Sequence, residues 1–167
     1  MIFYYLDASA WVKRYYQEIG TRWLGDLFSQ HPTFVGSTLG LIEVIATLAR
    51  KQKSREISSS SFEQKVHELE EDWGHFIQIQ LTVEAVGIAK ETAKDFALRG
   101  ADAIHLASAL MLQRRFTGEN DKLTFVTSDH ELKEAAQSAG IAVTDPHEEE
   151  SALARQSEDK ETSDEEE

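Results

Sequence analysis

The sequence predicts an α/β protein in which helices cover both faces of a mainly parallel central sheet, a three-layer α/β/α fold. Short apolar runs alternate along the chain with segments of helical periodicity, which is the pattern of parallel strands joined by crossover helices. The first run, residues 2–6, is continuously apolar and aromatic, as expected of a strand buried on both faces. The 167 residues suffice for one domain of ordinary size.

The first half of the chain reads as two strands, each followed by helical segments. Ser9 is expected to cap the first helix, and Pro32 closes the second. The apolar residues of the third helix recur on one stripe, which makes it amphipathic. The expected elements are a strand at 2–6, helices at 10–17 and 21–29, a strand at 33–35 and a helix at 38–53.

The second half continues the alternation. Ser60 or Ser61 is expected to open a helix that reaches Trp73, and Gly100 to cap the end of the helix at 83–98. Gly140 ends the last predicted helix. The remaining expected elements are strands at 76–81, 123–127 and 141–143 and helices at 101–115 and 131–139.

The formal net charge of −13 excludes a strongly cationic nucleic-acid-binding domain, but the charge is unevenly distributed. Residues 145–167 hold 11 acids and 2 bases, a net charge of −9, which leaves −4 for the rest. This end also lacks aromatic residues, so it cannot bury enough surface to offset its ordering entropy. We therefore expect a folded domain at 1–146 and a disordered acidic tail at 147–167.

Composition also restricts the chemistry and the location of the protein. The chain has no cysteine, which excludes disulfides, thiolate metal sites and cysteine nucleophiles. Its longest apolar run, residues 1–6, is far shorter than a membrane span and has no features of a signal peptide. The expectation is a cytoplasmic protein that makes no membrane contact.

Four acidic residues are placed to meet at one edge of the predicted sheet. Asp7 and Asp129 follow strands, whereas Glu43 and Asp102 lie in the first turns of helices, and in this topology both positions lie at the same edge. Two carboxylates about 4 Å apart repel by roughly 4 kcal/mol at an effective dielectric constant of about 20, so convergence calls for a shared proton or a divalent cation. Oxygen ligands without cysteine favour Mg²⁺ or Mn²⁺.

The segments around these four acids resemble the motifs of PIN-domain ribonucleases of the VapC toxin type. The third of these segments is the most specific of the set, and all four occur in the family's order within about residues 1–144. The matching segments are YLDASA at 5–10, STLGLIEV at 37–44, LRGADAIHLASA at 98–109 and FVTSDHEL at 125–132.

The resemblance implies a PIN-like nuclease domain at 1–146 and a function. It assigns the catalytic and metal-binding roles to Asp7, Glu43, Asp102 and Asp129, with Mg²⁺ or Mn²⁺ as cofactor. It implies endonucleolytic hydrolysis of RNA, leaving a 5′-phosphate and a 3′-hydroxyl, by the toxin of a type II toxin–antitoxin pair. A small antitoxin and a second copy of the chain are the implied partners. Motif positions 9 and 127 carry hydroxyls that could orient a carboxylate.

Other interpretations of these patterns stay open at this stage. The chain could be a catalytically silent PIN-like module that binds RNA or protein, or another Mg²⁺ enzyme on a similar sheet. His105 and His130 lie beside the motif acids, but we expect packing and surface roles for them, because oxygen ligands suffice for magnesium. Candidates for phosphate contacts are the basic residues Lys13, Arg14, Arg50, Lys51, Lys53, Arg55, Arg99, Arg114 and Arg115.

Overall fold

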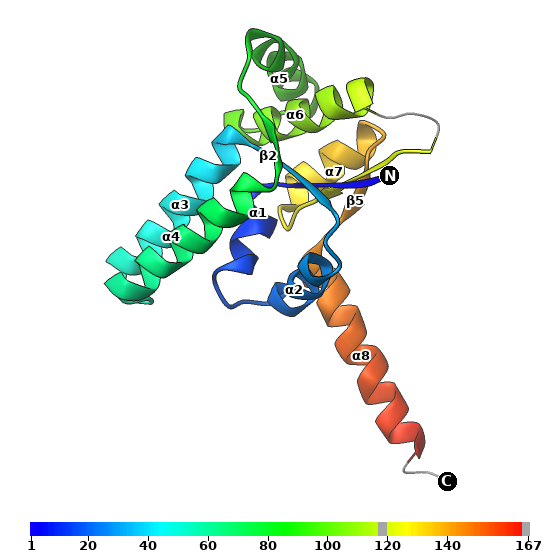
Figure 1. Ribbon diagram of the computed structural model, residues 1–167. Coiled ribbons are helices and arrows are strands. Elements are labelled where there is room, and N and C mark those ends of the chain that lie inside the picture. The colour runs from blue at the N-terminus through cyan, green and yellow to red at the C-terminus, as the bar shows by residue number, and fades with distance from the viewer. Residues whose placement is uncertain (117–119, 165–167) are drawn as a thin grey trace.

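The computed structural model confirms the predicted fold class: a five-stranded, entirely parallel sheet lies between two layers of helices (Figure 1). It describes residues 1–116 and 120–164, with side chains other than that of Phe116 and those beyond Gln156. The strand order is β3-β2-β1-β4-β5. The strands are β1 (Ile2–Leu6), β2 (Thr33–Ser37), β3 (Ile77–Ile79), β4 (Lys122–Val126) and β5 (Ala142–Thr144).

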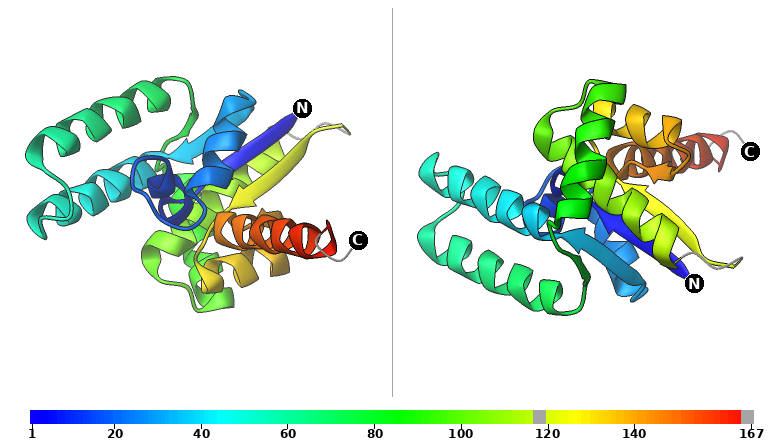
Figure 2. Two further views of the ribbon diagram at one scale, coloured as in Figure 1. Left: turned by 90° about the horizontal axis from the view of Figure 1, so that it is seen from below. Right: turned by 90° about the horizontal axis from the view of Figure 1, so that it is seen from above.

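Each face of the sheet carries its own set of helices and its own hydrophobic core (Figure 2). One core packs α5, α6 and α7 against the sheet, and the other packs α1 to α4 against the opposite face. The helices are α1 (Ala8–Trp11), the 3₁₀ turn η1 (Val12–Arg14), α2 (Thr21–Ser29), α3 (Thr38–Lys53), α4 (Ser59–Gly74), α5 (Val83–Phe96), α6 (Gly100–Phe116), α7 (His130–Ser138) and α8 (Pro146–Asp164).

The alternation of side chains along β1 explains why both faces need a cover. Phe3 and Tyr5 belong to the core under α5–α7, whereas Leu6 belongs to the core under α1–α4. Successive side chains of a strand point to opposite faces, so a run that is apolar at every position must be buried on both sides. The opposite core is rich in aromatic rings, with Trp11 stacked on Phe76 at a centroid distance of 4.8 Å.

The topology creates one crevice at the carboxyl ends of the central strands. The chain builds β2 and β3 on one side of β1 and then returns to place β4 on its other side. Leu6 pairs with Val126, so residues 7 and 127 leave the sheet side by side, and the Asp7 N–H donates to the Val126 carbonyl at 3.2 Å. Open parallel sheets bind ligands at such a reversal of strand order.

Three predicted helix caps are wrong. The N-cap of α4 is Ser58, whose hydroxyl accepts the Ser61 N–H at 3.1 Å, so the helix opens before Ser60. The N-cap of α1 is Asp7, whose carboxylate accepts the Ala10 N–H at 2.9 Å; Ser9 lies inside the helix. An Asp side chain directly after the strand reaches the free N–H groups first. The helix α5 ends at Ala97, which has a left-handed backbone with φ of 53°, and Gly100 is the first residue of α6. A left-handed cap usually favours glycine, which made Gly100 the expected choice.

The acidic C-terminal segment also differs from the expectation of disorder from residue 147. Residues 146–164 form α8, which begins beside α2 and extends away from the body of the protein (Figure 1); residues 165–167 lie outside the described residues. The Asp145 side chain accepts the His147 N–H at 2.9 Å and the Ser128 hydroxyl at 2.7 Å, which anchors the start of the helix. None of the described helices is long and apolar enough to cross a bilayer.

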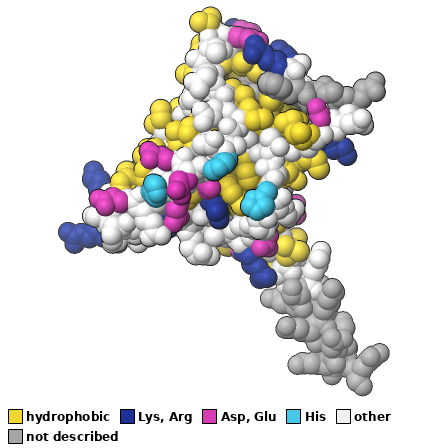
Figure 3. Space-filling model, viewed as in Figure 1, with side chains coloured by type: hydrophobic (Ala, Val, Ile, Leu, Met, Phe, Trp, Pro, Cys, Tyr) yellow, Lys and Arg dark blue, Asp and Glu magenta, His cyan; other side chains and the backbone are white. Residues whose placement is uncertain are grey.

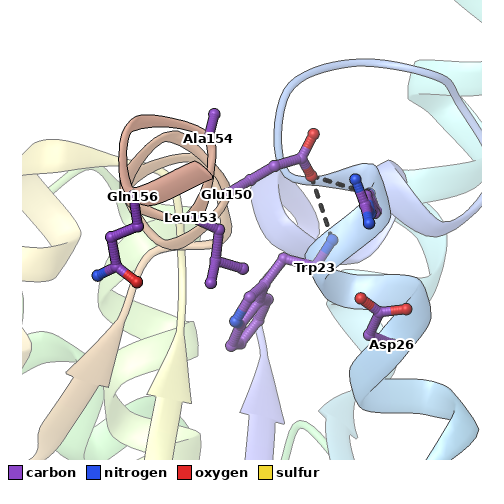
Figure 4. A pocket seen from close by; sticks show the side chains of 7 residues that line it. Trp23, Asp26, Glu150, Leu153, Ala154 and Gln156 are labelled. Atoms are coloured by element: carbon purple, nitrogen blue, oxygen red, sulfur yellow. Dashed lines mark hydrogen bonds between the residues drawn. The ribbon is translucent and has the colours of Figure 1, made fainter. Parts of the chain in front are cut away.

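A carboxylate of α8 also caps another helix. Glu150 Oε2 accepts the backbone N–H groups of Gly20, Arg22 and Trp23 at 3.0, 2.9 and 3.1 Å; Figure 4 shows the hydrogen bond to Trp23. The α2 N-cap is Gly20, with φ of 100°, and it has no side chain to do this. A β-carbon there would lie 2.9 Å from the Pro146 Cβ, so glycine also permits the close approach of α8. Composition alone could not reveal this contact, because the prediction of disorder weighed only apolar burial.

We expect Glu150→Ala to lower the free energy of unfolding by about 1–2 kcal/mol, because it leaves three N–H groups of α2 without their acceptor. Urea denaturation followed by circular dichroism measures the change. Glu149→Ala is the matched control, since Glu149 is an exposed neighbour on α8. Equal destabilisation by both variants would contradict a capping role for Glu150.

Candidate active site

Asp7 lies at the centre of the crevice and is almost completely buried, with 3% exposure. Besides the Ala10 N–H, its carboxylate receives two hydroxyls: Ser9 Oγ lies 2.9 Å from Oδ1 and 2.8 Å from Oδ2, and Thr127 Oγ1 donates to Oδ2 at 2.8 Å. The donors come from α1 and from the residue that follows β4. The motif hydroxyls at positions 9 and 127 therefore hold the orientation of the Asp7 carboxylate.

The same two hydroxyls join Asp7 to the segment that carries Asp129. Thr127 Oγ1 accepts the Asp129 N–H at 3.0 Å, and Ser9 Oγ accepts the Ser128 N–H at 2.9 Å. Asp129 in turn is the N-cap of α7, with Oδ1 accepting the Leu132 N–H at 2.9 Å. Both β1 and β4 thus continue into helices that are capped by an aspartate. The bonds of Ser9 and Thr127 hold each of these aspartates beside the loop that carries the other one.

Arg99 joins Asp129 to the third acid, Asp102. Its Nε lies 2.8 Å from Asp102 Oδ2 and its Nη2 lies 3.0 Å from Asp129 Oδ2. The hydrogen bond and the charge of Asp102, followed by the charge of Asp129, raise the pKa of Arg99, so the guanidinium stays charged. The arginine side chain is 71% exposed, whereas Asp102 lies in the first turn of α6 and is nearly buried. An exposed cation therefore pairs with two acids of the crevice and offsets one of their two negative charges.

Glu43 enters the site through a buried histidine. His105 Nε2 lies 2.7 Å from Glu43 Oε2, and Nδ1 lies 3.0 Å from the Tyr5 hydroxyl. A carboxylate can only accept, so Nε2 carries a proton. Burial raises the pKa of Tyr5, which keeps its hydroxyl protonated. A β-carbon on Gly40 would lie 3.1 Å from His105 Cε1, so glycine lets α3 approach the ring closely.

His105 and Arg99 are the residues whose roles the sequence left undecided. His105 was expected to pack within its own helix, but it bonds across to α3 and holds Glu43. Its position one turn after Asp102 on the same helix face was the available signal. Arg99 was a candidate for phosphate contact and instead pairs with two acids. His130 is exposed and faces Glu134 on its own helix, as expected of a surface residue.

The structure brings the four predicted acids to one edge of the sheet, linked by other groups rather than in direct contact. Thr127 links Asp7 to Asp129, Arg99 links Asp129 to Asp102, and His105 on the Asp102 helix holds Glu43. Within residues 1–116 and 120–164, no three acidic or histidine side chains are arranged to ligate one ion as they stand. The site is a ring of carboxylates that are contacted by one guanidinium and one imidazole.

The chemistry of this donor set fits a hard divalent cation. All four acids offer carboxylate oxygens, the ligands that Mg²⁺ and Mn²⁺ prefer. Burial raises the pKa of Asp7 above its ordinary 3.8; the charge of His105 and then the hydrogen bonds from Ala10, Ser9 and Thr127 act against this rise. The hydrogen-bond donors to a buried carboxylate do not always offset the cost of desolvating its charge. A nearby cation then stabilises the ionised form.

Comparison with known proteins identifies the family to which this site belongs. Residues 4–138 match the PIN domain family. The chain belongs to the PIN-domain family. It is 32% identical over 139 residues to Ribonuclease VapC45 of Mycobacterium tuberculosis, an alignment that covers 83% of this chain and 92% of that protein. The resemblance noted in the sequence motifs is therefore confirmed.

Solved structures of PIN proteins share the fold at lower identity. VapBC2 from Rickettsia felis, bound to a DNA fragment from its promoter, aligns with a TM-score of 0.57 at 16% identity, covering 87% of this chain and 98% of that one. PAE2754 from Pyrobaculum aerophilum aligns with a TM-score of 0.61 at 17% identity, and the alignment covers 92% of this chain and 90% of that one. At these identities the likeness concerns the fold of the PIN domain.

The raised pKa of Asp7 leads to a prediction about stability in metal-free solution. When an acid has a higher pKa in the folded than in the unfolded state, the folded protein loses stability as pH rises from the unfolded pKa, near 3.8, through the folded pKa. Asp7→Asn removes this loss. We therefore expect the unfolding free energy of the variant minus that of the unmodified protein to increase as pH rises through that range.

Urea denaturation in EDTA at a series of pH values measures this difference. Asp95→Asn, which removes an exposed carboxylate of α5, serves as the control and should follow the unmodified protein across the range. Parallel pH profiles for Asp7→Asn and the unmodified protein would show that burial does not raise the pKa of Asp7.

Proposed function

We propose that this PIN-domain protein is an endoribonuclease that requires Mg²⁺ or Mn²⁺ and hydrolyses phosphodiester bonds of RNA, leaving a 5′-phosphate and a 3′-hydroxyl. The observation that carries the proposal is the gathering of Asp7, Glu43, Asp102 and Asp129, from four distant segments, at the strand-order reversal of the sheet. The 32% identity to a protein named as a ribonuclease supports the choice of reaction.

The residues of the chain would act by holding and orienting. Asp7, Glu43, Asp102 and Asp129 would hold the divalent cation, which supplies a Lewis acid and lowers the pKa of a bound water. Ser9 and Thr127 fix the Asp7 carboxylate, and His105 fixes Glu43, so the oxygens are positioned before any ligand arrives.

The same relatives support a partner for the protein. The structures similar in fold include VapBC2 from Rickettsia felis and a toxin–antitoxin complex from Klebsiella pneumoniae. We infer that this chain is the toxin of a type II pair, inhibited by a small antitoxin, and that it works as a homodimer. Size-exclusion chromatography of the protein alone tests the homodimer, and co-expression with any small reading frame found beside its gene tests the antitoxin.

Purified protein is expected to cleave single-stranded RNA in the presence of Mg²⁺ or Mn²⁺ and to lose this activity in EDTA. Asp7→Asn and Asp102→Asn should each lower the rate about a hundredfold or more, because each removes an anionic oxygen ligand while keeping the size of the side chain. Gel analysis of a labelled RNA measures the rate, and 5′-end analysis of the products tests which side of the bond keeps the phosphate.

Asp95→Asn is the control for the loss of one negative charge and should cleave like the unmodified protein. Circular dichroism shows whether each variant is folded. RNA binding without turnover at every metal concentration would contradict the proposal and support the alternative, a silent PIN-like binding module. An unchanged rate in both Asp7→Asn and Asp102→Asn would show that the acids are not the catalytic site.

A further inference from the structure

A cleft of about 450 Å³ opens directly beside the carboxylates. The helical turns after β1 form one wall and α3 forms the other, and the inner end is formed by Ser9, Ser128 and Glu43. Ser9 bonds to Asp7, and Ser128 directly precedes Asp129, so this end of the cleft is continuous with the acidic site. In Figure 3 acidic and histidine side chains gather near the middle of the face shown, with basic side chains among them. A ligand at the carboxylates can therefore extend into the cleft.

The two basic residues of the cleft differ in what they already contact. Lys13 is buried, and its ammonium donates to Glu18 at 3.0 Å and to the Ile19 carbonyl at 3.0 Å. Arg50 is exposed, and within the described part of the chain its guanidinium donates to the Thr47 hydroxyl at 2.8 Å and pairs with no carboxylate. The charge of Lys13 is already balanced, whereas that of Arg50 is available to an anion.

Arg50 is also directed along the cleft toward the acids. Glu43, Thr47 and Arg50 are four and three residues apart, so they follow one another on one face of α3. The Thr47 hydroxyl donates to the Glu43 carbonyl at 2.8 Å while it accepts from Arg50, which turns the guanidinium back toward the helix start. Seven residues of helix separate the backbones of Glu43 and Arg50 by about 10 Å, and the contact with Thr47 places the guanidinium about one turn from Glu43, where it can meet a phosphate next to the one at the carboxylates.

We propose that this cleft binds the sugar–phosphate backbone of single-stranded RNA and that Arg50 binds a phosphate that flanks the one cleaved at the carboxylates. This inference rests on the proposed ribonuclease function. An arginine with free N–H groups matches phosphate oxygens in geometry and charge. The cleft volume lies in the range of sites that enclose a small molecule, which suits one nucleotide of a single strand.

Binding without turnover tests this subsite separately from catalysis. All variants carry Asp102→Asn, which is expected to stop cleavage, and the probe is a short fluorescein-labelled single-stranded oligoribonucleotide of mixed sequence in Mg²⁺. Arg50→Gln should weaken binding about tenfold at low salt, which is the loss of one charge-assisted phosphate contact. The slope of log affinity against log salt should fall by about 0.7, because one phosphate is no longer neutralised.

Three further variants separate this contact from a general effect of charge. Arg114 is exposed and was a candidate for phosphate contact, but it lies about 18 Å along α6 from Asp102, so Arg114→Gln should leave both affinity and salt slope unchanged. Arg50→Lys keeps the charge and should restore most of the affinity. Thr47→Val keeps the shape and removes the hydroxyl that directs Arg50, so it should give an intermediate loss. Urea denaturation confirms that each variant is folded.

Equal affinity and salt slope for Arg50→Gln and Arg114→Gln would overturn the subsite, even if the unmodified protein cleaves RNA. Tighter binding of the same oligoribonucleotide after annealing to its complement would overturn the choice of a single strand. A tenfold loss confined to Arg50→Gln, in a protein that never cleaves RNA, would leave the subsite standing and reject the ribonuclease function. In an active protein, Arg50→Gln should raise KM and leave kcat nearly unchanged.

Discussion

The burial of the Asp7 carboxylate is the constraint on which the rest of the site depends. Asp7 ends the central strand, where the sheet and two helical layers exclude water, so its negative charge is desolvated. A buried charge persists only when donors or counter-charges compensate for its lost hydration. The Ala10 N–H and the hydroxyls of Ser9 and Thr127 supply part of this compensation, and a divalent cation at the crevice would supply more.

The other three acids meet the same requirement by different means. Asp102 and Asp129 share the Arg99 guanidinium, and Glu43 is held by His105, which the Tyr5 hydroxyl contacts on its other side. Each of these partners joins two different elements: Arg99 joins the starts of α6 and α7, and His105 joins α6 to α3. The site is therefore a product of packing: α3 and α6 must approach closely at Gly40 for His105 to reach Glu43.

The charge distribution reconciles an acidic chain with a nucleic-acid substrate. The last 23 residues carry a net charge of −9, and most of them lie in α8, which extends away from the body of the protein. The contacts of Glu150 with the start of α2 hold this helix at the side of the domain. In the function we propose, Arg50 and a bound divalent cation would then attract phosphate locally, because screening at physiological salt limits the reach of exposed charges to about 8 Å.

The sequence by itself determined the order of the strands and of the helices up to α7, the parallel three-layer class and the four candidate acids, because periodicity and motif spacing are local properties. The continuously apolar run at residues 2–6 already required helices on both faces of the sheet. Only the tertiary structure decided which groups accompany the acids: Arg99 between Asp102 and Asp129, and His105 on Glu43. The same holds for the α2 cap supplied by Glu150, 130 residues away from Gly20. Contacts between distant segments depend on how the layers pack, and local patterns in the sequence do not predict that packing.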